Sequence, residues 1–322
     1  MRVSVCIPTL DRIVFFREAF ASVLAQTEPA FEIIVSDNSG DRVYGALVET
    51  VVEEERRAAP GVPVRLIHQP TRLPLPAHIN AQIDAATGDA WAYLPDDDRW
   101  RPPFLSTMVR LLSQRPEAGF AFCDHSIIDE GGKTDREETE RISTLFGRSG
   151  LPEGFIPHDG LFSLALAGTF ALQATVFRKE VIDAFRFEPG NLTFEWDVLL
   201  RMTASERDFG AVYCSERMVE VRFHRGQFGA PQESAARSML RSLDGVAPVP
   251  KEAKRAYRRR RVVAYSALAG SLTQQGRRWE AARSLLAGLR TDPFYRPTYR
   301  QLALAWLPKR FIDRVRAAVR QS

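Results

Sequence analysis

The sequence of 322 residues predicts an α/β protein, with a doubly wound, mostly parallel sheet followed by an α-helical C-terminal region. Short apolar runs alternate with amphipathic stretches over the first third of the chain, and beyond residue 251 the apolar residues keep helical spacing. We therefore expect an α/β domain at residues 1–228, a linker at 229–250 with three prolines, and a basic helical region at 251–322.

The N-terminal elements are expected to alternate between strand and helix. Strands are predicted where short apolar runs end in turn residues, at 3–8, 31–40, 64–69, 90–94 and 119–124. Helices are predicted where apolar residues recur every three or four positions, at 14–25, 44–57, 76–86 and 102–114. This rhythm is typical of βαβ units, which build parallel sheets.

The alternation breaks after residue 124. Residues 130–159 are rich in charge and glycine and have little periodicity, which predicts a mobile surface loop that closes over a bound substrate. The uncharged run at 160–177 is interrupted by polar residues, so we expect a buried helix and a strand there, not a membrane span. A helix start at "FEWDVLLRM" and two strand-like pieces, at 211–216 and 218–224, complete the domain.

Composition limits the class of protein. Hydrophobic residues make up 45% and charged residues 26%, which is typical of a soluble globular protein. The start, "MRVSVCIPTLDR", lacks the long apolar run of a signal peptide. Cys6, Cys123 and Cys214 are far apart and lie in apolar segments, so we expect reduced core thiols and a cytoplasmic protein.

Charge is divided unevenly along the chain. Residues 251–322 hold 18 Lys and Arg against 4 Asp and Glu, a net charge of +14, whereas the remainder carries −10. The acidic part is not expected to bind nucleic acid. The last stretch, 306–322, spaces apolar residues among arginines, which predicts contact with an anionic membrane surface. The alternative is a helix that packs on the catalytic domain with its basic face in water.

Three consecutive aspartates, Asp96, Asp97 and Asp98, directly follow the strand expected at 90–94. A solvated loop is the simplest interpretation of such a run. However, the carboxyl ends of strands are where open α/β sheets bind ligands. Carboxylates together with substrate phosphates are the usual ligands of Mg²⁺. The sequence therefore predicts a metal–diphosphate site here.

Polar residues also end the first two strands. Asp37 begins "DNSG", which is ordinary turn chemistry but could equally bind a nucleobase or a ribose. Pro8, Thr9 and Asp11 end the neighbouring strand, so the two turns are expected to form a crevice. Since no glycine-rich phosphate loop is present, metal and basic side chains would have to neutralise a diphosphate.

Glu195 and Asp197 lie at the amino end of a predicted helix. They either complement the helix dipole, worth ~0.3–1 kcal/mol, or one of them is a general base. Their spacing directs them to different sides, so we expect only one to face the site. His224, flanked by Arg222 and Arg225, is either a structural histidine or part of a phosphate or metal site.

Six segments together resemble family 2 glycosyltransferases: "VSVCIPTLDR", "ASVLAQT", "FEIIVSDNSG", "AATGDAWAYLPDDDRW", "FEWDVLLRM" and "VRFHRGQ". They occur in the family's order over residues 2–227, and the chain is similar to bacterial members that build surface polysaccharides. The resemblance implies the A-type glycosyltransferase fold, a nucleotide-sugar donor and Mg²⁺ or Mn²⁺. A UDP-sugar is the first expectation, with GDP- and dTDP-sugars as alternatives.

The resemblance also implies roles for individual residues. Asp37 would contact the base or ribose beside Pro8 and Thr9, with Arg72 near the base. Asp97 would approach the ribose or the metal. The metal ligands would be Asp96, Asp98 and His224, and Glu195 would be the catalytic base, with Asp197 next in line. Three departures from the family pattern are Asp11 in place of the usual Asn, "TRLPLP" in place of Asn-x-Gly, and Phe194-Glu195 in place of Glu-Asp.

The function expected from these observations is inverting transfer of a sugar to a hydroxyl of a glycan or lipid-linked acceptor, at the inner face of the membrane, by a monomer or an oligomer. One alternative is a metal-dependent nucleotidyltransferase, although the glycine-rich basic loop typical of that class is absent after the first strand. The other is a non-enzymatic adaptor that binds polyanions through its basic tail. Such an adaptor would show steeply salt-dependent binding.

Overall fold

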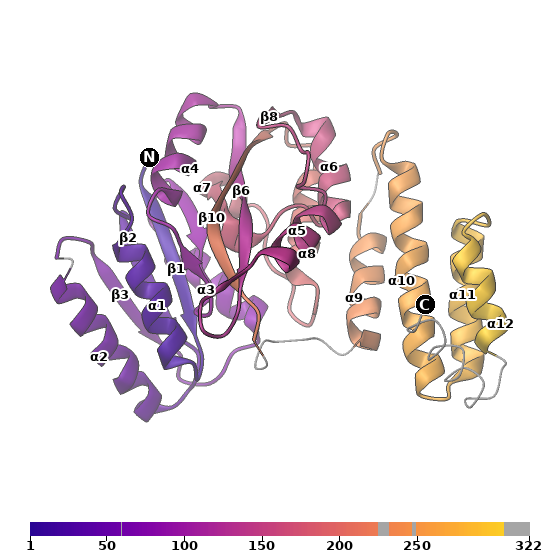
Figure 1. Cartoon of the computed structure of the whole chain (residues 1–322), viewed down its shortest axis with the longest axis horizontal. Coiled ribbons are helices and arrows are strands. Elements are labelled where there is room, and N and C mark those ends of the chain that lie inside the picture. The colour runs from indigo at the N-terminus through magenta and orange to yellow at the C-terminus, as the bar shows by residue number, and fades with distance from the viewer. Residues whose placement is uncertain (59, 225–231, 247–248, 306–322) are drawn as a thin grey trace. The chain divides into compact units, whose positions relative to one another are not determined.

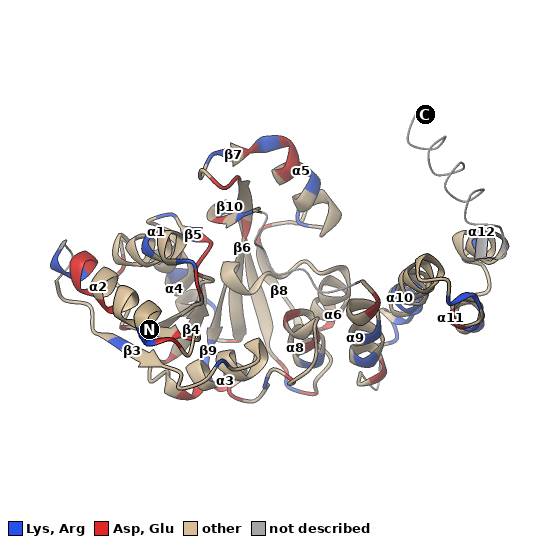
Figure 2. Cartoon of the chain, turned by 90° about the horizontal axis from the view of Figure 1, so that it is seen from below, with Lys and Arg blue, Asp and Glu red and all other residues tan. Residues whose placement is uncertain are grey.

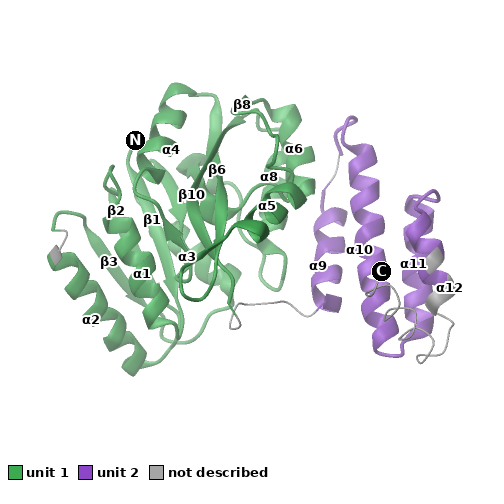
Figure 3. Cartoon of the chain, viewed as in Figure 1, with its two compact units in different colours: residues 1–227 green, residues 228–322 purple. Residues whose placement is uncertain are grey.

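The computed structural model describes residues 1–58, 60–224, 232–246 and 249–305 (Figure 1). The chain forms two compact units, Met1–Gln227 and Phe228–Ser322 (Figure 3). The first unit is built on a mixed sheet of ten strands, and the second is helical. The predicted α/β class with a helical C-terminal region is confirmed.

The sheet has the order β3-β2-β1-β4-β9-β6-β10-β5, with β7 paired to β6 and β8 to β10. Its strands are β1 Val3–Thr9, β2 Glu32–Asp37, β3 Val64–His68, β4 Ala90–Tyr93, β5 Arg99–Trp100, β6 Ala118–Ile128, β7 Thr134–Asp135, β8 Gly154–Ile156, β9 Thr175–Arg178 and β10 Gly210–Arg222. The first four are parallel, as predicted. In contrast, β9 runs antiparallel between β4 and β6.

Helices cover both faces of the sheet, as the term doubly wound implies. The helices of the first unit are α1 Ile13–Leu24, α2 Arg42–Ala58, α3 Leu75–Ala85, α4 Phe104–Gln114, α5 Arg136–Leu145, α6 His158–Ala167, α7 Lys179–Ile182 and α8 Phe194–Thr203, with a short 3₁₀ turn at Leu172–Ala174. Val5 and Ile7 of β1 share one core with apolar residues of α1, α2 and α4. Cys6, which points the other way, contacts the Gln82 carbonyl of α3.

Residues 130–159 correct the prediction of a mobile loop, because they contain α5. The Asp135 carboxylate caps this helix by accepting a hydrogen bond from Glu138 N, and acidic residues fill its first turn. Ile142 is buried in the main core. The periodicity was weak because few apolar residues anchor the helix. The expectation that residues 130–159 form a loop that closes over a bound substrate is therefore withdrawn.

Two further segments bear on the predictions. The strand-like pieces at 211–216 and 218–224 form one long strand, β10, interrupted by register shifts on either side of Arg217. The uncharged run at 160–177 forms α6 and β9, as predicted. All three cysteines are free and buried, as expected from their apolar surroundings.

The second unit contains α9 Gln232–Asp244, α10 Lys254–Gln274, α11 Arg278–Thr291 and α12 Arg296–Ala305. Helix α9 lies in the segment predicted as a linker, because Ala236 and Leu240 pack against Ala264 and Leu268 of α10. Lys and Arg are spread along α10 and α11 (Figure 2). No helix among the described residues is long and apolar enough to span a bilayer. The predicted membrane-binding stretch, 306–322, lies outside the described residues.

Candidate active site

The carboxyl edge of β1 and β2 holds the first group of predicted site residues. Thr9 pairs with Asp37 across the two parallel strands, and Pro8 pairs with Ser36. Asp37 is buried; its Oδ1 accepts a hydrogen bond from Ser39 N at 2.8 Å, and its Oδ2 lies 3.1 Å from His68 Nδ1. The turn and the neighbouring strand therefore fix this carboxylate at the strand end.

The turn after β1 directs a basic side chain toward the aspartates. Asp11 adopts a left-handed backbone conformation with φ of 55°, which a short polar residue tolerates better than most. The hydroxyl of Tyr44 accepts a hydrogen bond from Arg12 N at 3.1 Å and lies 2.6 Å from Thr9 Oγ1. The guanidinium of Arg12 then reaches both Asp96 and Asp97, at 2.5 and 2.6 Å.

The three aspartates are buried, so they do not form a solvated loop. The exposed fractions of Asp96, Asp97 and Asp98 are 1%, 7% and 3%. Asp96 Oδ2 accepts a hydrogen bond from Leu10 N at 3.1 Å, which ties β4 to the turn after β1. Burial raises the pKa of Asp96 to about 7, although Arg12 opposes the shift.

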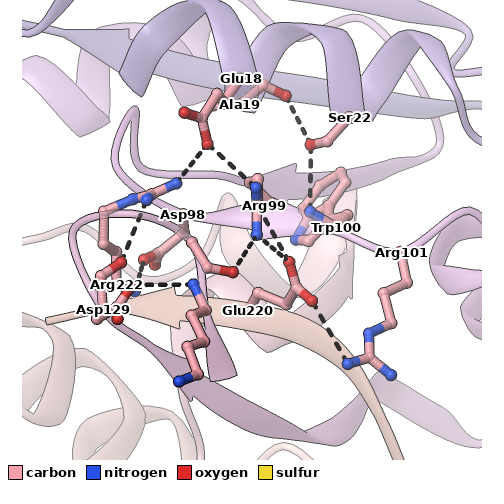
Figure 4. Close-up of polar contacts among 12 residues, drawn as sticks. Glu18, Ala19, Ser22, Asp98, Arg99, Trp100, Arg101, Asp129, Glu220 and Arg222 are labelled. Atoms are coloured by element: carbon pink, nitrogen blue, oxygen red, sulfur yellow. Dashed lines mark hydrogen bonds and ion pairs between the residues drawn. The ribbon is translucent and has the colours of Figure 1, made fainter. Parts of the chain in front are cut away.

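Arg222, at the end of β10, anchors the segment that carries Asp98 (Figure 4). It is fully buried, and its backbone N–H donates to Asp98 Oδ1 at 2.9 Å. Its guanidinium donates to the Asp97 and Glu130 carbonyls, both at 2.9 Å, and to Glu18 Oε2 at 2.6 Å. Burial and the neighbouring Asp97 raise the pKa of Asp98 well above its usual range.

His224 lies against the same cluster. Its Nε2 is 3.0 Å from Asp97 Oδ2, and its ring is 5.2 Å from that of Phe15 in α1. The imidazole therefore adds a nitrogen donor beside the aspartates.

Glu195 and Asp197 differ in their surroundings. Asp197 is buried, and its Oδ2 accepts a hydrogen bond from Arg201 Nε at 2.9 Å within α8. Glu195 is half-buried, and burial together with the charge of Asp97 raises its pKa to about 7. Glu195 therefore lies in the electrostatic field of the aspartates, whereas Asp197 is held by its own helix.

Arg72 is exposed in the segment before α3. A Cβ added at Gly40 would lie 3.3 Å from Arg72 N, so the backbone of Arg72 approaches the turn that follows Asp37. Gly40 has φ of +66°, and this close approach leaves little room for a side chain.

Sequence reasoning gave Arg12 and His68 no role, and it considered Arg222 only as a basic neighbour of His224 at a possible phosphate or metal site. Arg12 lies three residues after the end of β1, and its place in the turn after that strand is the local signal for it. His68 ends β3 beside Asp37, and strand order alone would have placed it there. The contact between Arg222 and Glu18 joins residues 204 positions apart, and no local pattern indicates it.

A divalent cation would find suitable donors in this cluster, because two buried carboxylates and an imidazole match its oxygen and nitrogen preferences. Burial, together with the charge of Asp97, raises the pKa of Asp98, so a cation bound there would favour its charged form. In the described part of the chain, however, no three Asp, Glu, His or Cys side chains already converge as ligands. Arg12 instead contacts two of the three aspartates.

Solved structures share this fold. A Staphylococcus aureus TarS fragment, residues 1–349, in complex with UDP-GlcNAc aligns with a TM-score of 0.63 and 13% identity, over 95% of this chain and 89% of that one. The mannosyltransferase PcManGT from Pyrobaculum calidifontis, in complex with GDP-Man and Mn²⁺, aligns with a TM-score of 0.60 and 15% identity, over 94% and 79%.

Curated relatives match over shorter stretches. Protein CgeD of Bacillus subtilis is 25% identical over 130 residues, 39% of this chain and 30% of CgeD. The GalNAc(5)-diNAcBac-PP-undecaprenol beta-1,3-glucosyltransferase of Campylobacter jejuni is 24% identical over 187 residues, 58% of this chain and 54% of the relative. The matches thus span about a third to a half of these relatives. The family model for glycosyl transferase family 2 matches residues 4–167, just over half of the chain, and the chain belongs to that family.

Proposed function

We propose that the protein transfers a sugar from a nucleotide-diphosphate sugar to a hydroxyl of a glycan or lipid-linked acceptor, with inversion, in bacterial surface polysaccharide synthesis. The observation that carries this proposal is the buried cluster of Asp96, Asp97 and Asp98 at the carboxyl end of β4, close to Glu195. The names of the relatives add support, since one is an undecaprenol-linked glucosyltransferase and two structures hold nucleotide sugars.

The nucleoside is proposed to bind at the ends of β1 and β2. Asp37 would accept hydrogen bonds from the base or the ribose, with Pro8 and Thr9 beside it and Arg72 over the adjacent turn. Asp11, whose left-handed backbone precedes Arg12 in the same turn, would take part in donor binding beside them. We expect UDP first and GDP or dTDP as alternatives.

Asp98 and His224 are proposed to hold Mg²⁺ or Mn²⁺, with Asp97 joining them and Asp96 available once Arg12 moves away. A bound cation would offset the charge that develops on the departing diphosphate. Arg12 is then free to turn toward the phosphates. No glycine-rich loop supplies backbone donors there, so this guanidinium would share in their neutralisation.

Glu195 is proposed as the general base that removes the proton of the acceptor hydroxyl as its oxygen attacks the anomeric carbon. A pKa of about 7 suits a base that works near neutral pH. Asp197 is the weaker candidate because Arg201 holds its carboxylate. Alignment of donor and acceptor converts their encounter into an intramolecular step, worth up to ~7–11 kcal/mol in favourable cases.

We further propose that the protein works in the cytoplasm at the inner face of the membrane, with the basic helical region meeting anionic lipid. The support is the net charge of +14 over residues 251–322. Assembly into an oligomer stays a prediction.

Calorimetric titration with UDP, GDP, dTDP and CMP, with and without Mn²⁺, tests the proposed function. We expect one nucleoside diphosphate to bind in a metal-dependent manner and Asp98→Asn to abolish that binding. Asp89→Asn is the matched control, since Asp89 precedes β4 and pairs with Arg2 at the opposite end of the strand. Absence of nucleotide binding under every condition would refute the proposal.

A further inference from the structure

A cavity of about 450 Å³ lies beside β6, β10 and the segment that follows α5. Its floor is formed by buried residues and its rim by exposed ones; the lining includes Asp124, Ser143, Arg148, Tyr213, Ser215 and Arg217. None of these residues belongs to the site described above. The volume falls within the range of small-molecule sites, roughly 300–1,000 Å³.

Asp124 orients two arginines at the floor of this cavity. Its Oδ1 accepts hydrogen bonds from His125 N and from Arg148 Nε, at 2.9 and 2.6 Å. Its Oδ2 accepts from Ser143 Oγ and from Arg217 Nε, at 2.9 and 3.1 Å. Four donors thus saturate the carboxylate, and they keep its pKa low despite burial. Asp124 is therefore a support for the arginines and has little capacity left for a ligand.

The two arginines differ in how they are held. Arg148 is buried, and its guanidinium also donates to the Thr169 carbonyl at 3.1 Å. Arg217 is held by Asp124 only through Nε, so its outer edge faces away from that support. There it donates to Glu140 of α5 through two parallel hydrogen bonds of 2.7 and 3.0 Å.

Glu140 shows which chemical group fits the outer edge of Arg217. A planar guanidinium binds a carboxylate through two parallel hydrogen bonds, and this pair has that arrangement. The Glu140 side chain is 64% exposed, and pairs of this kind contribute little to stability. A carboxylate from a ligand can therefore take its place at small cost.

We propose that the carboxylate of an acidic saccharide binds at this cavity, with Arg217 as the bidentate donor and Glu140, which lies next to the lining residues, as the carboxylate that the ligand displaces. Ser143, Ser215 and Tyr213 line the same cavity and offer hydroxyls to a sugar ring. Asp124 offsets one of the two lining arginines and Glu140 offsets the other, so a ligand that displaces Glu140 has to be anionic to restore the balance.

The cavity and the proposed donor site share two strands. Arg217 pairs with Asp124 at the cavity, and Arg222 pairs with Ile128 four residues further along β6, where its N–H meets Asp98. At ~3.3 Å per residue the two places lie roughly 13 Å apart along the strand. This role rests on the proposed function. The cavity would hold an acidic sugar unit of the acceptor, at a distance from the acceptor hydroxyl that reacts.

Binding of sodium glucuronate to the full chain, measured by isothermal titration in the absence of nucleotide, tests this inference, with glucose and inorganic phosphate as comparison probes. We expect saturable binding of glucuronate, about tenfold weaker in Arg217→Gln because the bidentate pair is lost. Glu140→Gln should tighten binding about threefold, since it removes the competing carboxylate. The matched controls are Arg141→Gln and Glu138→Gln, which remove a second ion pair on α5, and both variants should bind as wild type does.

Equal binding of glucose and glucuronate, or an equal loss in Arg141→Gln and Arg217→Gln, would overturn the inference. Preferential binding of phosphate would overturn the choice of a carboxylate. Glu140→Gln does not touch Asp124, so its effect stays informative if Arg217→Gln folds poorly. Nucleotide titration of the same samples separates the two proposals, because each binding event is measured without the other ligand.

Discussion

His78 provides a test of the burial at the carboxyl edge of β2. It lies in α3, is 1% exposed, and its Nε2 is 2.7 Å from Ser36 Oγ. Burial lowers its pKa from 6.5 to about 4, and the charge of Asp37 only partly opposes the shift. The unfolded chain therefore binds a proton that the folded chain does not between pH 6.5 and 4. The stabilisation contributed by neutral His78 is complete above pH 6.5 and is lost as pH falls toward 4.

The pKa shift of His78 sets how much the free energy of unfolding should change with pH. A change from 6.5 to about 4 corresponds to ~3.4 kcal/mol at 1.36 kcal/mol per pKa unit. Urea unfolding of wild type and His78→Gln at several pH values from 7.5 to 4 measures it. The raised pKa values of Asp96 and Glu195 act in the opposite direction, but they act in both proteins and cancel in the difference. We expect the free energy of unfolding of wild type minus that of His78→Gln to fall by up to ~1.4 kcal/mol per pH unit below pH 6.5. Parallel curves would refute the reasoning.

Three other predictions concern the site and α5. Glu195→Gln should slow sugar transfer by ~10²–10⁴-fold, with nucleotide binding retained. Asp197→Asn should mainly lower the free energy of unfolding, by ~1–3 kcal/mol in urea, because it weakens the hydrogen bond from Arg201. Arg12→Gln should raise the pKa of Asp96 further, as carbon-13 NMR of the carboxylate would show; an unchanged value would contradict the ion pair. Ile142→Ala should lower the free energy of unfolding by ~2–4 kcal/mol because Ile142 is buried. Leu145 is exposed on the same helix, so Leu145→Ala should change it by less than ~0.5 kcal/mol. Equal, small effects would mean that α5 is not anchored.

The elements that the sequence predicted correctly are those that local patterns determine. The apolar runs before Asp37 and before Asp96 end at polar residues, and the helices between the strands make the strands parallel, so both carboxylates lie at the same sheet edge. In contrast, the direction of β9 depends on the strands on either side of it, which its own residues do not encode. Helix α5 was missed because one buried isoleucine and an aspartate cap, rather than a full apolar stripe, define it.

The contacts of the two arginines explain how three adjacent aspartates can be buried together. Arg12 binds the carboxylates of Asp96 and Asp97, whereas the guanidinium of Arg222 binds the Asp97 carbonyl and Glu18. Asp98 receives the backbone N–H of Arg222, which carries only a partial charge. Burial, together with the charge of Asp97, raises the pKa values of Asp98 and Glu195, and no cationic side chain in the contacts above binds the Asp98 carboxylate. A cluster that is neutralised on one side only is most readily completed by a small, highly charged cation, and this is the physical reason to look for metal-dependent nucleotide binding at this edge of the sheet.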